Sequence, residues 1–129
     1  MEKDNVCKTP RWRILKATLN NLSAQAFKEK VAAGEAIVVD VRKLEEYKEM
    51  HLPNALHIDY FEAAFWDKMM QLDKTKDILV YCRSGRRSIR VCTLMKNGGF
   101  EEAKIFNLNG GIIEWLEAFP SEVEGSVIS

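Results

Sequence analysis

A chain of 129 residues has the length of one ordinary domain, and it is long enough to bury roughly two-thirds of the surface of its unfolded form. Its hydrophobic content of 47%, against 29% charged residues, excludes a disordered segment. Nineteen basic side chains balance nineteen acidic ones, so no overall field favours nucleic acid or an anionic membrane. We therefore expect a globular domain that has neither as a partner.

The first residues carry charges where a secretion signal would need an apolar run, and no stretch approaches the eighteen or so apolar residues of a membrane span. The three cysteines show no close pairing of the kind found in disulfide frameworks. We expect a cytoplasmic protein with free thiols. Cys7 is interpreted as an exposed bystander.

Secondary structure is poorly predicted at the start of the chain and clearly predicted from residue 18 onward. Residues 1–17 mix charged and apolar side chains without a regular period, which predicts an arm that packs back through Trp12. A short strand is predicted over 18–22. Ser23 is placed to cap a helix by accepting a hydrogen bond from a backbone N–H, and Gly34 ends that helix.

In the middle and at the end of the chain, apolar stretches typical of strands alternate with stretches typical of helices. Residues 37–41, which are apolar except for Asp40, and the continuous apolar run over 78–81 are typical of strands buried on both faces of a parallel sheet. Shorter strands are predicted over 55–58 and 103–106. Helical spacing of apolar residues is found over 61–72, 89–95 and 112–119, and the charged stretch over 42–50 is predicted to form a short exposed turn or helix. Strands that alternate with helices predict a doubly wound α/β domain over 18–120, followed by a tail over 121–129.

The most informative stretch is the loop that follows the strand over 78–81. Cys82 stands at the carboxyl end of this strand, where ligands bind in such sheets. The start of the next helix and the arginines of the loop favour the thiolate, which is the nucleophilic form of cysteine. Gly85 allows successive backbone N–H groups to converge on one anion. We expect the sulfur to lie open to solvent at the mouth of a ring of amides.

The length of this loop distinguishes between two classes of enzyme. Phosphatases that use a catalytic cysteine place an arginine six positions after it, where the guanidinium binds the phosphate in a bidentate manner. Here that position is Ser88, and Arg87 comes one residue early. The loop is therefore too tight for a phosphate cradle, and a cysteine-dependent phosphatase or arsenate reductase is kept as the alternative.

The chain resembles single-domain rhodaneses, a family of sulfurtransferases, over 19–119. The matching segments are 38–42, 46–47, 51–58, 81–88, 98–100 and 110–111, together with Leu108 and Trp115. The resemblance implies a five-stranded parallel sheet flanked by helices on both faces and a persulfide formed on Cys82. It also implies a small anionic sulfur donor such as thiosulfate, and an acceptor that is cyanide, a thiol or a thiol-bearing protein. No metal or organic cofactor is implied.

The same resemblance assigns roles within the loop. The backbone N–H groups of 83–88 would surround the outer sulfur of the persulfide, and Arg83 or Arg86 would attract the donor. Ser84 stands where thiosulfate-specialised members carry a lysine, so the physiological donor stays open. A binding module that uses the fold without catalysis is a further alternative. The substrate-binding candidates are thus Arg83, Ser84, Gly85, Arg86, Arg87 and Ser88.

Four residues outside the loop have both structural and functional interpretations. Asp40 either orients the loop or pairs with a basic residue. Arg42 is a further candidate for supporting the site, although a structural role, meeting Glu46 across one helical turn, is favoured. Cys92 lies among apolar residues in a helix and is predicted to be core, with a role as a resolving thiol as the alternative if its sulfur faces Cys82. His57 either serves as a base for Cys82 or ends the third strand. The histidines lack the spacing of a zinc site, so no metal is expected.

Overall fold

The structure is a computed structural model that describes residues 10–125. Within this part of the chain, five parallel strands form one sheet in the order β1-β5-β4-β2-β3. The predicted fold class is therefore confirmed. The strands are β1 (Asn20–Leu22), β2 (Ile37–Asp40), β3 (Leu56–His57), β4 (Ile78–Tyr81) and β5 (Ile105–Leu108).

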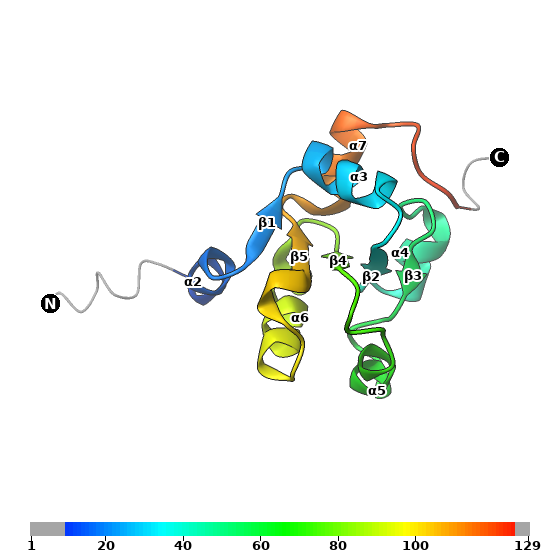
Figure 1. Cartoon of the computed structure of the whole chain (residues 1–129). Helices are drawn as coiled ribbons and strands as arrows, with labels where there is room; N and C mark the ends of the chain where they lie inside the picture. Colours follow the sequence, from blue (N-terminus) through cyan, green and yellow to red (C-terminus); the bar gives the residue numbers. More distant parts are fainter. Residues whose placement is uncertain (1–9, 126–129) are drawn as a thin grey trace, which may run out of the picture.

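Helices cover both faces of the sheet (Figure 1). Helices α5 and α6 lie against one face, whereas α3 and α7 lie against the other (Figure 1). The described helices are α2 (Arg11–Ala17), α3 (Ala24–Ala32), α4 (Leu44–Glu49), α5 (Phe65–Met70), α6 (Arg86–Asn97) and α7 (Gly111–Ala118), with a 3₁₀ turn, η1, at Glu102–Lys104. No helix among the described residues is long and apolar enough to cross a bilayer.

The central strand β4 is buried throughout because both layers of helices cover it. Its side chains alternate between the two faces, as a strand requires. Ile78 and Val80 belong to the core on the side of α5 and α6, and Leu79 and Tyr81 belong to the core on the side of α3 and α7. This packing fixes the direction in which the chain leaves β4, and hence the position of Cys82.

The predicted helix cap at Ser23 is present in the structure, whereas several strand boundaries differ from those predicted. The Ser23 side chain caps α3 by accepting a hydrogen bond from Ala26 N–H at 3.1 Å, as predicted. The predicted fifth strand over 103–106 was placed two residues early, because η1 occupies the positions just before β5. Strands β1 and β3 are shorter than predicted.

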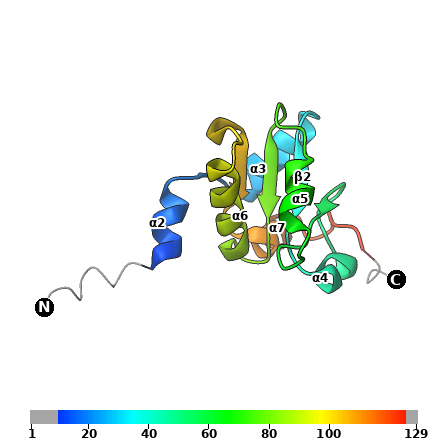
Figure 2. The same ribbon diagram turned by 90° about the horizontal axis from the view of Figure 1, so that it is seen from below.

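The predicted N-terminal arm contains a helix that its sequence did not indicate. Helix α2 lies beside α6, as Figure 2 shows, and its Trp12 ring stacks on the Arg86 guanidinium at 4.3 Å. The carbonyl of Lys16, at the other end of α2, accepts a hydrogen bond from the Asn21 side chain at 2.9 Å. The expectation that this segment packs back through Trp12 is confirmed. Cys7, and residues 126–129 of the predicted tail over 121–129, lie outside the described residues.

Candidate active site

The Cys82 side chain lies beneath the loop that follows β4. Cys82 is only 1% exposed, so the expectation that its sulfur lies open to solvent was wrong. The physical reason is that Cys82 continues the buried strand and joins the same apolar cluster as Val91 and Cys92. The sulfur is still surrounded by polar groups on the loop side: Gly85 N–H donates to Sγ at 3.1 Å, and Ser88 Oγ lies 3.5 Å from Sγ.

The loop turns sharply at Gly85 to start α6. Gly85 has φ +99°, a left-handed conformation that is easy only for glycine, and it forms the N-cap of the helix. The first N–H groups of α6 have no partner inside the helix and carry partial positive charge. Within the described loop over 83–88, Gly85 supplies the one amide hydrogen bond to the sulfur. Arg83, Ser84 and Arg86 are exposed around it.

The start of α7 packs tightly against the backbone of the loop. Ile112 N–H donates to the Cys82 carbonyl at 2.9 Å, and Ile113 N–H donates to the Arg83 carbonyl at 3.2 Å. Gly111 has φ +68°, and a Cβ placed on it would lie 2.3 Å from the Arg83 carbonyl oxygen. The approach of these two segments therefore depends on the missing side chain at this position.

We expect Gly111→Ala to lower the free energy of unfolding by about 2 kcal/mol more than Gly34→Ala, because overpacking against backbone adds to the cost of the left-handed conformation. Gly34 is the matched control, since it has φ +88° and open space around its Cβ position. Urea denaturation of both variants measures the difference. Equal losses would show that the contact at Gly111 relaxes without cost.

A chain of buried amide and hydroxyl groups lies behind the sulfur. Ser88 Oγ lies 2.6 Å from Asn107 Oδ1, to which it donates, and Asn107 Nδ2 donates to Asn21 Oδ1 at 2.9 Å. Ser88 and Asn107 are both fully buried. Sequence reasoning missed both asparagines, although a polar residue inside an otherwise apolar strand, as Asn107 is in β5, was an available signal.

Glu46 on α4 holds one of the loop arginines in place. Arg87 makes two hydrogen bonds to the Glu46 carboxylate, at 2.9 and 3.2 Å, and Lys43 N–H donates to the same carboxylate at 3.1 Å. These bonds, first of all the one from Arg87, hold the pKa of Glu46 below its ordinary value. The predicted pairing of Glu46 with Arg42 was wrong, because Arg42 lies before the start of α4 and turns toward Asp40.

The Glu46→Gln substitution should lower the free energy of unfolding modestly, by about 0.5–1 kcal/mol at pH 7, because the ion pair is partly exposed. Since the pKa is lowered in the folded state, this stabilisation is complete above the ordinary value of 4.5 and disappears as the pH falls through the folded value. Urea denaturation of Glu46→Gln and wild type at pH 7 and pH 3 compares the two. If the two proteins differed in free energy of unfolding as much at pH 3 as at pH 7, the ion pair of the Glu46 carboxylate would not be the source of the stabilisation.

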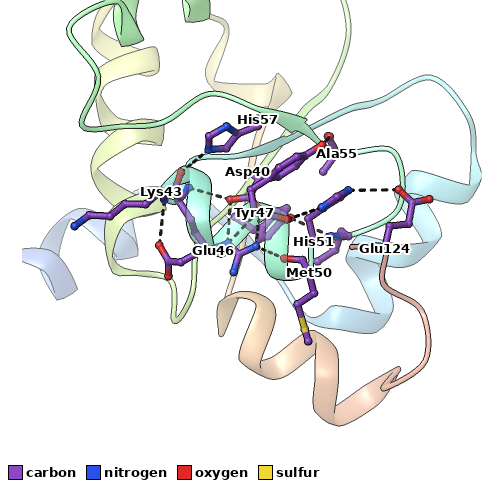
Figure 3. A network of polar contacts seen from close by, with 12 residues as sticks. Asp40, Lys43, Glu46, Tyr47, Met50, His51, Ala55, His57 and Glu124 are labelled. Carbon is purple, nitrogen blue, oxygen red and sulfur yellow. Dashed lines mark hydrogen bonds and ion pairs between the residues drawn. The ribbon is translucent and has the colours of Figure 1, made fainter. Parts of the chain in front are cut away.

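A second, deeper ion pair lies under the carboxyl ends of β2 and β4. Arg42 donates to both carboxylate oxygens of Asp40, at 2.7 Å for the shortest bond, and Tyr81 O–H donates to the same carboxylate at 2.6 Å. Arg42 also donates to the Met50 carbonyl at 2.6 Å, so this pair joins β2 to the end of α4 (Figure 3). Burial, and then the Asp40 carboxylate, raise the pKa of Tyr81.

This network engages Asp40 and Arg42 structurally. Among the described residues, the side-chain hydrogen bonds of Asp40 go to Arg42 and Tyr81, and Tyr81 directly precedes Cys82 in the chain. His57 ends β3, with Nε2 2.7 Å from the Arg42 carbonyl oxygen (Figure 3). The histidine is therefore bonded to this network and not to Cys82. Cys92 is fully buried, as predicted, and burial raises the pKa of its thiol.

Two cavities open beside the loop and meet at Phe61 and Arg87, which line both. Neither is lined by Cys82 itself. The larger has a volume of about 680 Å³ and is lined by Trp12, Tyr60, Phe61, Arg86, Arg87 and Arg90. The smaller, of about 400 Å³, is lined by Lys43, Glu46, Phe61, Arg83 and Arg87. Four arginines thus surround the approach to the loop.

Comparison with known proteins finds a matching family and several similar chains. Residues 23–118 match the family model of the rhodanese-like domain. The chain is 39% identical over 98 residues to the putative sulfurtransferase YtwF of Bacillus subtilis, covering 75% of this chain and 90% of that one. It is 33% identical over 93 residues to the thiosulfate sulfurtransferase GlpE of Coxiella burnetii, covering 72% and 83%. The crystal structure of the BH2092 protein of Bacillus halodurans superposes with a TM-score of 0.71 at 28% identity, covering 89% and 83%.

Proposed function

The chain belongs to the rhodanese-like domain family, and from this premise we propose that it is a sulfurtransferase that carries sulfane sulfur as a persulfide on Cys82. In the first half-reaction, the Cys82 thiolate attacks the outer sulfur of a donor such as thiosulfate. The sulfur–sulfur bond of the donor breaks, and sulfite leaves with the electron pair. In the second, cyanide or a thiolate attacks the outer sulfur of the persulfide, and the pair returns to Cys82 as thiolate.

The observation that carries this proposal is the hydrogen bond from Gly85 N–H to the Cys82 sulfur at the start of α6. Negative charge on sulfur is stabilised by a backbone N–H and by the positive end of a helix. The outer sulfur of a persulfide would extend about 2 Å beyond Sγ. It would then meet the first-turn N–H groups of α6, which have no partner inside the helix.

A small anionic donor fits the charges around the loop. No described residue between 10 and 125 forms a salt bridge with Arg83 or Arg86, and both side chains are exposed. Such groups attract anions from solution. The relative GlpE is named a thiosulfate sulfurtransferase, which supports thiosulfate as a donor here.

The phosphatase alternative is less well supported. The position six residues after Cys82 holds Ser88, whose hydroxyl is buried against Asn107, so no guanidinium extends from it. Arg87, the nearest arginine, is bound to Glu46. A bidentate grip on a phosphate at the sulfur would require this pair to open.

Mass spectrometry of the intact protein tests the proposal. After incubation with thiosulfate and removal of excess donor, wild-type protein should gain the mass of one sulfur atom, and cyanide should remove it. Peptide mapping should locate the added sulfur on Cys82. The absence of this gain with thiosulfate and with other sulfane donors, together with hydrolysis of an aryl phosphate, would decide for the phosphatase.

A further inference from the structure

The larger cavity beside the loop has a wall that the family match does not include. Trp12 belongs to α2, whereas the match begins at residue 23. The other lining residues come from the segment before α5 and from α6. Its volume of about 680 Å³ lies in the range of sites for small organic molecules and far exceeds the space that thiosulfate requires.

The lining is basic and contains no carboxylate. The charge of Arg87 is balanced by a salt bridge to Glu46, which lines the smaller cavity. None of the residues over 10–125 forms a salt bridge with Arg86 or Arg90. The whole chain has a formal net charge of zero, so this positive charge is a local feature. Guanidinium groups bind carboxylates and phosphates through paired, directional hydrogen bonds.

The spacing of the two unpaired arginines determines what they can bind together. Arg86 and Arg90 are four residues apart on α6, so they lie on the same face of the helix, about 5–6 Å apart at Cβ. A ligand that engages both needs two anionic groups separated by a few bonds.

Aromatic rings form the sides of the cavity. The Trp12 ring lies 4.3 Å from the Arg86 guanidinium, which orients this arginine and anchors α2. Tyr60 and Phe61 pack edge to face, with ring centroids 5.2 Å apart.

We propose that this cavity is the acceptor site and that it takes a small thiol carrying two anionic groups. As a statement about the acceptor, this rests on the proposed sulfurtransferase function. The anionic groups bind Arg86 and Arg90. The thiolate of the ligand attacks the outer sulfur of the Cys82 persulfide, the bond from that sulfur to Cys82 breaks, and the electron pair returns to the Cys82 sulfur. The ligand leaves as a persulfide.

Binding of mercaptosuccinate, a thiol with two carboxylates, tests the site without sulfur loading. Calorimetry on the full chain should show saturable binding by the wild type and none of 2-mercaptoethanol. Arg90→Gln should weaken the binding by about tenfold, the usual size of a lost charge-assisted contact. Trp12→Ala should weaken it by about fivefold, with circular dichroism as the check on its folding. The matched control is Lys76→Gln, which removes one exposed positive charge before β4, at the opposite edge of the sheet.

Turnover gives the second measurement. Persulfide-loaded wild type should transfer sulfur to mercaptosuccinate at least about tenfold faster than to 2-mercaptoethanol, and Arg90→Gln should lose this preference while Lys76→Gln keeps it. No binding of mercaptosuccinate, or equal weakening by Arg90→Gln and Lys76→Gln, would overturn the proposal in favour of an acceptor bound elsewhere, such as a protein. Failure of the sulfurtransferase function itself would be visible separately, as the absence of sulfur uptake from any donor.

Discussion

Replacement of Cys82 by serine is expected to lower the rate of sulfur transfer from thiosulfate to cyanide by at least about a thousandfold, because removal of a nucleophile removes the covalent route. Serine preserves the size of the side chain and can still accept the hydrogen bond from Gly85 N–H. A loss of activity is therefore attributable to the sulfur. Formation of thiocyanate gives the rate, and intact mass gives the loading.

Cys92→Ala is the matched control, because Cys92 is the other cysteine among the described residues and is also buried. It should load one sulfur and retain a transfer rate within about threefold of wild type, since a small core substitution affects stability more than chemistry. Loading that survives in Cys82→Ser would contradict the persulfide proposal. An equal loss in both variants would show that the two thiols act together.

Asp40→Ala should produce the largest loss of stability, about 3–5 kcal/mol, because it leaves the buried Arg42 guanidinium without a counter-charge. Asp40 is fully buried, and the Arg42 side chain is 5% exposed. The Tyr81 hydroxyl would also lose its acceptor. This loss is a large fraction of the stability of an ordinary domain, and thermal and urea denaturation would measure it.

Glu62→Ala removes one partner of an exposed ion pair and serves as the comparison. Its carboxylate lies 3.0 Å from Lys68 Nζ, and both side chains are about half exposed. Such pairs contribute about 0–1 kcal/mol. If Asp40→Ala cost no more than Glu62→Ala, the buried network would contribute little to the fold, and the connection between β2 and the end of α4 would need another explanation.

Sequence patterns predicted best the strands in which nearly all residues are buried. The mostly apolar stretches over 37–41 and 78–81 predicted the strands β2 and β4, because strands that are buried on both faces consist almost entirely of apolar residues. The fifth strand was misplaced because Asn107 interrupts its apolar character. Helix α2 was missed because it has no buried residue and its stacking partner, Arg86, is distant in sequence. Only the folded chain brings these residues together.

The candidate site was predictable in its loop and not in its surroundings. The residues over 82–88 are consecutive, so their spacing carried the information. The supporting contacts join segments far apart in sequence, such as Glu46 with Arg87 and Ser88 with Asn107. The exposure of Cys82 was misjudged because a residue at a strand end is open or buried according to how the chain packs around it, here α6 and the start of α7.

Because all strands of the sheet are parallel, the loops at its two edges differ in how freely their length can change. In an all-parallel sheet every strand points the same way, so the loops that surround Cys82 are gathered at one edge. The turns at 33–36, 71–77 and 98–101 gather at the other. Insertions or changes of length there are expected to leave the surroundings of Cys82 undisturbed, which gives the protein one edge that is free to diverge or to accept a fused domain.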